Sequence, residues 1–280
     1  MTRDNIADWA AARSDKWRRQ LTGLEAMLAP LDAPLIRALG LDTPCQVADV
    51  GCGSGATTLE VVRRAPSGTV GHGFDLSPAL IEVARRRAAN DASVCFEVAD
   101  VGVAAPSAGP YDRLVSRLGV MFFNDPPSAF ANLRRWLVPD GRFAFAVWGP
   151  VADNALMLAT REAVAEAIDL APIDPSAPGP FRYGDAAPLL AALQGAGFVE
   201  LAVEDWRGTL PIGGRSGAPE AAHFALASFS SFAERLAEAG GDSPHRARQL
   251  LTDRFRPYER DGAVAMAARA HIVTGRVKGA

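Results

Sequence analysis

The chain is poor in cysteine, and the little that it has argues against two classes of protein. Its 280 residues include three cysteines, Cys45, Cys52 and Cys95, and none of them are spaced as CxxC. Disulfide-stabilised secreted domains carry several paired cysteines, and structural zinc sites use closely spaced cysteine and histidine ligands. We therefore expect neither a disulfide framework nor a metal site, and buried thiols in their place.

The chain also lacks an excess of charge of one sign and any long apolar run. Its formal net charge is −3 and its isoelectric point is about 5.9, so it offers no basic footprint for nucleic acid. No apolar stretch reaches the roughly 18 to 20 residues of a membrane span, and residues 1–20 are too polar for a signal peptide. These absences predict a cytoplasmic protein with no nucleic-acid partner and no membrane span.

The most informative stretch that is present is QVADVGCGSG, residues 46–55. The short apolar run from Val47 to Val50 predicts a buried strand, which ends where Gly51 permits a positive φ angle. Residues 57–64 then predict a helix. The two later glycines leave space for a ligand beside bare N–H groups at the start of that helix, which indicates a nucleotide site.

Apolar strands and amphipathic helices are predicted to alternate through the first half of the chain. Strands that are separated by crossover helices form a parallel sheet with helices on both faces, so the fold class is α/β. The expected strands are 46–50, 69–74, 94–98, 111–116 and 142–148, and the expected helices are 57–64, 78–90 and 128–137.

The flanking segments are expected to complete one domain that spans residues 1–280. Helical spacing of leucines predicts an N-terminal helical cap at 1–40, split at Pro30 and Pro34, and the proline-rich run 171–180 predicts irregular structure. The further expected elements are helices at 189–196, 220–239 and 244–255 and strands at 199–210 and 263–276. The expected divisions are a cofactor-binding core at 41–148, lid or insertion segments at 149–188 and 213–260, and completing segments at 189–212 and 261–280.

Two acidic residues follow successive predicted strands. Asp75 lies 20 residues after Gly55, and Asp100 follows the next strand. Ligands of open parallel sheets bind beyond the carboxyl ends of the strands, where a carboxylate accepts both ribose hydroxyls. We expect this role for Asp75, and contact with adenine for Asp100 and the backbone of Val101. The alternative for each acid is a helix N-cap.

The spacing of the glycines distinguishes between two cofactors. A dinucleotide fingerprint reads GxGxxG, whereas here the glycines are 51, 53 and 55, residue 56 is alanine, and Asp49 precedes the turn. With VADVGCGSGATT, GFDLSPALIEVARRRA, EVAD, YDRLVSRLGVMFFNDP and LRRWLVPDGRFAFAVW, the chain resembles the class I S-adenosylmethionine-dependent methyltransferases between residues 47 and 148. It is most similar to their small-molecule branch, near the quinone-biosynthesis enzymes.

This resemblance implies a Rossmann-like fold with a mostly parallel seven-stranded sheet, whose last strand is antiparallel. It implies S-adenosyl-L-methionine as cofactor. It also implies that Asp49 and the loop Gly51, Cys52, Gly53 and Gly55 surround the methionine part, with Ser116 beside its amino group. Asp75 and Leu76 would hold the ribose, and Asp100 and Val101 would flank the adenine. The sequence SRLG from Ser116 replaces the NPPY-type motif of adenine-specific DNA members, which argues against a nucleobase substrate.

Methyl transfer is an in-line displacement that depends mainly on orientation, so we expect few acid–base residues. His223 and His271 are the weak candidates for a general base, while His72 is expected to be packed within a strand. Apolar side chains near strand ends are candidates for the acceptor pocket, with core packing as the alternative. These candidates are Trp17, Met121, Phe122, Trp148 and Phe181; Trp9 and Trp17 could also cover the pocket.

The predicted function is methyl transfer to an O, N or C nucleophile of a small molecule. One alternative is a non-methylating protein that uses the same pocket for regulation or for a rearrangement, and another is an NAD-dependent oxidoreductase. The sequence leaves open the acceptor, the general base and the oligomeric state, a homodimer included.

Overall fold

The structure, a computed structural model, describes residues 20–215, 217–228 and 232–279. The chain divides into two compact units. The first, the sheet unit, comprises residues 31–149, 175–206 and the described part of 270–280. The second, the helical unit, comprises the described parts of 1–30, 150–174 and 207–269. Each unit is described separately below, and the single-domain division expected above stays a prediction.

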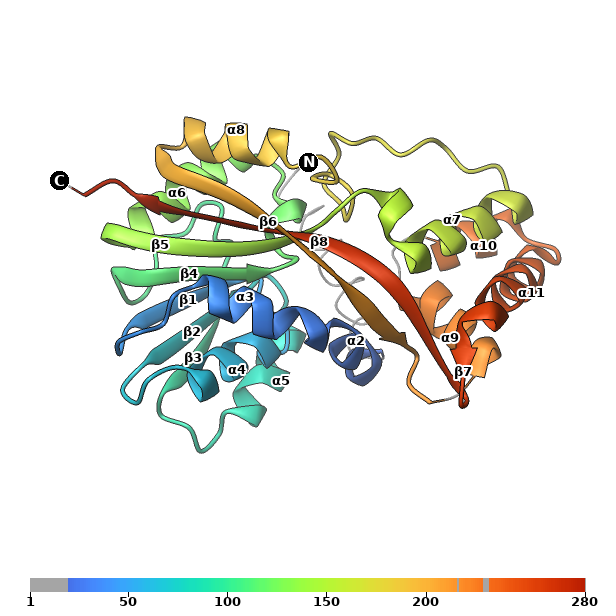
Figure 1. Ribbon diagram of the computed structural model, residues 1–280, viewed down its shortest axis with the longest axis horizontal. Coiled ribbons are helices and arrows are strands. Elements are labelled where there is room, and N and C mark those ends of the chain that lie inside the picture. The colour runs from blue at the N-terminus through green and yellow to red at the C-terminus, as the bar shows by residue number, and fades with distance from the viewer. Residues whose placement is uncertain (1–19, 216, 229–231, 280) are drawn as a thin grey trace. The chain divides into compact units, whose positions relative to one another are not determined.

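The sheet unit is built around a sheet with the strand order β3-β2-β1-β4-β5-β8-β6 (Figure 1). Neighbouring strands from β3 through β5 are parallel, and β8 runs antiparallel to β5. This arrangement confirms the expected fold class, with a two-residue strand, β7, in addition to the seven expected strands. The strands are β1 Gln46–Val50, β2 Val70–Asp75, β3 Val94–Val98, β4 Tyr111–Arg117, β5 Leu137–Trp148, β6 Phe198–Ile212, β7 Glu259–Arg260 and β8 Ala263–Val277.

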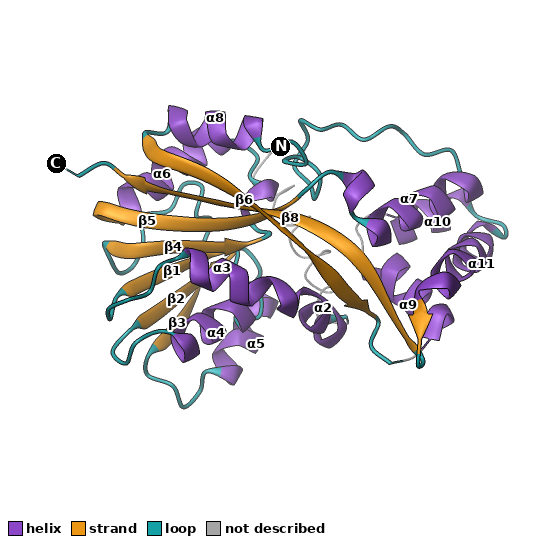
Figure 2. Cartoon of the chain, in the orientation of Figure 1, coloured by secondary structure: helices purple, strands orange, loops and turns teal. Residues whose placement is uncertain are grey.

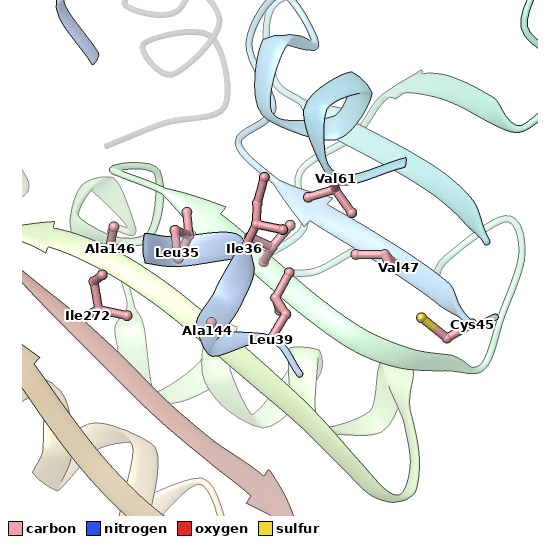
Figure 3. Packing of buried hydrophobic residues seen from close by; sticks show 10 residues of the cluster. Leu35, Ile36, Leu39, Cys45, Val47, Val61, Ala144, Ala146 and Ile272 are labelled. Atoms are coloured by element: carbon pink, nitrogen blue, oxygen red, sulfur yellow. The ribbon is translucent and has the colours of Figure 1, made fainter. Parts of the chain in front are cut away.

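Strand β5 shows how the sheet is covered on both faces. Its side chains alternate, so Ala144 and Ala146 point to one face, while Phe143 and Phe145 point to the other. The alanines belong to a buried cluster with residues of α3, Asp32–Ala38, and α4, Ala56–Arg64, shown in Figure 3. On the opposite face, Phe145 stacks with Phe130 of α6, Pro126–Trp136, with 6.2 Å between ring centroids. Each fully buried leucine, isoleucine, valine or phenylalanine contributes about 1.5–3 kcal/mol, so the core strongly stabilises this layered arrangement.

Most predicted boundaries in the sheet unit agree with the structure to within a few residues, and the deviations have local causes. Helix α6 begins at Pro126, two residues early, because the Asp125 carboxylate caps the Ser128 N–H and prolines fit a first helical turn. Pro34 likewise lies inside the first turn of α3 and does not end a helix. The helices are α3 Asp32–Ala38, α4 Ala56–Arg64, α5 Pro78–Arg87, α6 Pro126–Trp136 and α8 Ala187–Gly195, with short 3-10 turns η1 Ala29–Leu31 and η2 Val120–Phe122.

The helical unit is less well predicted. The sequence pattern predicts no helix in the first part of segment 149–188, but α7, Ala155–Ala167, lies there (Figure 2). The described parts of the helix expected at 220–239 belong to α9 and α10. No described helix is long and apolar enough to cross a bilayer. The helices are α2 Leu21–Leu28, α7 Ala155–Ala167, α9 Gly217–Ser228, α10 Phe232–Ala239 and α11 Ser243–Phe255, with 3-10 turns η3 Val151–Asp153 and η4 Arg256–Tyr258.

Candidate functional site

The loop between β1 and α4 uses its three glycines for different purposes. Gly51, Gly53 and Gly55 have φ angles of 70°, 56° and 82°, a region that L-residues with side chains rarely adopt. A Cβ atom at Gly51 would lie 3.1 Å from Cα of Gly119, and one at Gly55 would lie 2.6 Å from the Phe96 ring. At Gly53 nothing lies within 4 Å. The first and third glycines therefore permit close packing, while the middle one faces open space.

Backbone hydrogen bonds hold this loop against the neighbouring strand. The N–H groups of Gly51 and Cys52 both donate to the carbonyl of Phe74, at 2.8 and 3.0 Å. Helix α4 then starts at Ala56, and the residue before it, Gly55, provides no side-chain cap. The N–H groups of the first helical turn have no partner within the helix, so they are available to a ligand.

Asp75, at the end of β2, is oriented by two backbone donors. Its Oδ2 accepts the Gly53 N–H at 2.9 Å, and its Oδ1 accepts the Ser77 N–H at 2.8 Å. Burial raises the pKa of this carboxyl, and the two hydrogen bonds act in the opposite direction. The N-cap of α5 is Ser77, whose hydroxyl accepts the Leu80 N–H. Ser77 and not Asp75 therefore caps α5, and the carboxylate of Asp75 lies at the glycine loop.

Asp49, near the end of β1, is a buried acid, and one of its carboxylate oxygens accepts no hydrogen bond from the described residues. Its side chain is 1% exposed, and Oδ2 accepts the hydroxyl of Thr58 at 2.6 Å. Oδ1 has no hydrogen-bond partner among the described residues. Burial raises the pKa of Asp49 to about 7, against the lowering effects of the Thr58 hydrogen bond and the Arg117 charge. A buried acceptor without a donor is costly, and it marks a position that a ligand donor could satisfy.

Arg117 and Asp32 form a nearly buried ion pair that the sequence reasoning missed. Nη1 of Arg117 lies 2.9 and 3.0 Å from the two carboxylate oxygens of Asp32, and the side chains are 10% and 11% exposed. Asp32 also accepts the hydroxyl of Thr57, in the first turn of α4. Burial raises the pKa of Asp32, while Arg117 lowers it. No sequence signal links residues 85 positions apart, so only the fold could reveal this pair.

Asp100 and Val101 lie where β3 ends, as expected, but their contacts are local. The exposed Asp100 accepts the Gly102 N–H at 2.9 Å, within its own turn. Val101 is buried, and its carbonyl accepts a hydrogen bond from the side chain of Asn132. Leu76 is 40% exposed beside Asp75. Their roles toward adenine and ribose stay predictions.

Ser116 and Cys52 are buried at the same edge of the sheet. The hydroxyl of Ser116 donates to the carbonyl of Val50 at 2.7 Å and so ties the end of β4 to the end of β1. The Cys52 thiol lies among apolar side chains, and burial raises its pKa. Both residues are therefore part of the framework of the loop, and their contact with a ligand stays a prediction.

Among the candidate acceptor-pocket residues of the sheet unit, Met121, Phe122 and Phe181 lie on segments that contact each other. The carbonyl of Met121 accepts the Gly179 N–H at 3.1 Å, and Arg182 donates to the carbonyl of Phe123. These contacts place the segment 175–184, which carries the half-buried Phe181, beside the turn η2 that carries Met121 and Phe122. Trp148 is 3% exposed at the end of β5. Trp9 and Trp17 lie outside the described residues.

The two histidines predicted as bases have different surroundings. In the sheet unit, His271 is 5% exposed; its Nδ1 lies 2.7 Å from an Asp205 carboxylate oxygen and its Nε2 3.0 Å from the Gly184 carbonyl. In the helical unit, His223 is exposed on α9. His72 bonds the Tyr111 hydroxyl within the sheet, as expected of a packed histidine. A catalytic role for His223 or His271 stays a prediction.

Comparison with known proteins agrees with this arrangement. Residues 47–141 match the family model described as a methyltransferase domain. A malonyl-(acyl-carrier protein) O-methyltransferase of Halalkalibacterium halodurans is 33% identical over 112 residues, 39% of this chain and 41% of that protein. A trans-aconitate 2-methyltransferase of Methylobacterium nodulans is 33% identical over 139 residues, 50% of this chain and 49% of that protein. The chain thus spans half or less of the length of these relatives.

A solved structure shares the fold without a close sequence. The (4+2)-cyclase SpnF superposes with a TM-score of 0.54 at 18% identity, over 89% of this chain and 82% of that one. The stretch matched by the family model includes the glycine loop and the strand ends that carry Asp49, Asp75 and Ser116. The resemblance inferred from the motifs is confirmed, because residues 47–141 of this chain are similar to the methyltransferase-domain family.

Proposed function

We propose that the protein is an S-adenosylmethionine-dependent methyltransferase that acts on a nucleophile of a small molecule. The observation that carries the proposal is the glycine loop, where the open side of Gly53 lies beside Asp75 and the uncapped start of α4. The relatives named above support an oxygen nucleophile, because one is called an O-methyltransferase. Nitrogen and carbon acceptors belong in the same tests.

Asp75 would hold the ribose. A carboxylate has about four lone-pair sites, of which Asp75 uses two for the N–H groups of Gly53 and Ser77. The remaining sites suit two adjacent hydroxyls, and the backbone donors keep the carboxylate oriented before a ligand arrives. Asp100 and Val101 would then flank the adenine, one strand further out in the sheet order.

The bound cofactor would supply an electrophilic methyl group, and the residues of this chain would bind it, orient it and exclude water. Orientation accounts for much of the rate of such a displacement, and a dry site favours a step in which charge is neutralised. Met121, Phe122 and Phe181 are suited to an apolar wall, because hydrogen bonds hold the segments that carry them together. We further propose a cytoplasmic location and a small-molecule acceptor.

Isothermal titration calorimetry with S-adenosylhomocysteine and with NADH tests the cofactor. We expect binding of the first and none of the second, and the reverse would overturn the proposal in favour of hydride transfer. Transfer of a radiolabelled methyl group to a panel of carboxylic acids, phenols and amines then tests the activity. Since this fold also occurs in a cyclase, cofactor binding without transfer to any acceptor would favour a non-methylating protein.

A further inference from the structure

Arg117 offers hydrogen-bond donors that its ion pair leaves unused. Both contacts to Asp32 come from the same nitrogen, Nη1. Nε and Nη2 make no hydrogen bond with any residue that the structure describes, although the side chain is only 10% exposed. Neither nitrogen is among the fully buried, unpartnered side-chain atoms of the described residues, so both are accessible to a small ligand. A guanidinium fixed on one side presents the remaining N–H groups in a rigid plane that matches a carboxylate.

The position of this pair connects it to the glycine loop. Asp32 also binds Thr57, the second residue of α4, and so lies at the helix start that follows Gly55. The residue before Arg117 is Ser116, whose hydroxyl bonds the carbonyl of Val50, the last residue before the loop. Arg117 is therefore held where β1 turns into α4.

The charges around this position suit a zwitterion. Asp49 feels the charge of Arg117, and its buried Oδ1 lacks a donor among the described residues. An ammonium group supplies three donors and no acceptor, and a carboxylate supplies only acceptors. An amino-acid group could therefore satisfy Oδ1 of Asp49 with its ammonium and the unused N–H groups of Arg117 with its carboxylate, whereas an uncharged substituent would satisfy neither.

We infer that Arg117, oriented by Asp32, binds the α-carboxylate of the methionyl group and thereby selects adenosyl ligands that carry an amino acid over those that do not. This inference rests on the proposed function and specifies how the same site recognises its cofactor. Arg117 is a binding residue, and Asp32 is a positioning residue that acts through it.

The test compares two ligands on each variant by calorimetry. S-adenosylhomocysteine carries the amino-acid group, and 5′-methylthioadenosine lacks it. Arg117→Met should lower the affinity for S-adenosylhomocysteine by about tenfold or more, because a charge-assisted pair is lost. Its affinity for 5′-methylthioadenosine should stay within about twofold of the wild-type value. Arg117→Lys should fall between wild type and Arg117→Met, since it keeps the charge but loses the planar fork. Asp32→Asn should also reduce the preference for S-adenosylhomocysteine over 5′-methylthioadenosine, by a smaller factor than Arg117→Met does.

Arg113→Met is the matched control, because Arg113 lies on the same strand and its guanidinium bonds the carbonyls of Leu39 and Gly40. It should leave the ratio of the two dissociation constants unchanged. Circular dichroism checks folding; if Arg117→Met does not fold, the ratios for Arg117→Lys and Asp32→Asn decide. Equal weakening of both ligands, or an unchanged ratio, overturns the inference. Failure of the wild type to bind either ligand instead overturns the proposed function.

Discussion

The glycine-loop edge of the sheet unit and the helical unit use charged residues in different ways. At the loop, Asp32 and Asp49 are almost completely buried. In the helical unit, Arg254 pairs with Glu162 and Glu166 on side chains that are 25%, 53% and 52% exposed. Exposed pairs contribute little and cost little, whereas buried carboxylates are expensive unless something binds them. The comparison indicates that the sheet unit carries a cost in stability at the position where we propose that a ligand binds.

Glycine conformation alone does not distinguish the two regions. The helical unit also contains glycines with positive φ and open space where a Cβ atom would lie, among them Gly241 with φ of 58°. What sets Gly53 apart is its neighbour, because its N–H donates to Oδ2 of Asp75, a carboxyl whose pKa is raised by burial. This combination of an open glycine with a desolvated acid supports the site that we propose.

The largest expected effect tests this combination directly. Gly53→Val should abolish measurable binding of S-adenosylhomocysteine, a loss of about 100-fold or more, because the side chain fills the open space and strains the loop. Calorimetry measures the affinity. Gly241→Val introduces similar backbone strain in similarly open space in the helical unit, and it should bind as the wild type does. A folded Gly53→Val protein with normal affinity would remove the basis of the comparison.

The second prediction concerns the ribose acid. Asp75→Ala should lower the affinity for S-adenosylhomocysteine by at least about tenfold, roughly 1.4 kcal/mol, because the two ribose hydroxyls lose a charged acceptor. Glu259→Ala is the control in the helical unit, since Glu259 also accepts a backbone N–H, that of Ala218 at 2.9 Å. We expect this control to change stability but not affinity. Equal affinity of the Asp75 variant and the wild type would count against the ribose assignment.

The third prediction concerns pH. Burial raises the pKa of Asp49 to about 7, so the carboxylate that an ammonium group needs forms only as the pH rises through that value. Affinity for S-adenosylhomocysteine should increase by up to about tenfold from pH 6 to pH 8, as the ionised fraction increases. Asp49→Asn should abolish this dependence. An equally steep profile in the variant would assign the titration to another group.

The same shift has the opposite consequence for stability. The unfolded chain releases the Asp49 proton near pH 4, whereas the folded protein holds it to about pH 7. The contribution of this group to the free energy of unfolding is therefore complete at low pH and is lost as the pH rises through about 7. In thermal unfolding without ligand, the Asp49→Asn protein should be more stable than the wild type at pH 8. This advantage over the wild type should be smaller at pH 5.

The smallest expected effect concerns His271. Replacement by Ala should lower the free energy of unfolding by about 1–3 kcal/mol, because the buried hydrogen bonds of His271 to Asp205 and to the Gly184 carbonyl are lost. Denaturant unfolding measures this change, with His223→Ala, at an exposed position, as the control that should be nearly neutral. Turnover of the folded variants addresses the predicted role as a base: an unchanged kcat for His271→Ala would exclude it.

Local patterns were sufficient for most of the sheet unit. Strands β1 and β3 have the predicted bounds, because short apolar runs between turn residues offer few alternatives. The helical unit was harder, since the apolar residues of α7 lie in an Ala-rich segment without a clear start signal. The acceptor-pocket candidates could not be settled for a related reason: an apolar side chain near a strand end suits a core and a pocket equally well.

The amino-acid sequence by itself determined the strand that ends in a glycine turn, the helix after it and the acids at successive strand ends. These depend on local backbone freedom and on periodicity, which neighbouring residues specify. Only the tertiary structure decided that Arg117 pairs with Asp32, that Asp49 has a buried oxygen without a hydrogen-bond partner among the described residues and that Gly53 is the loop glycine that faces open space. Those properties depend on the strand order, which places β4 beside β1 and so brings distant charges together away from water.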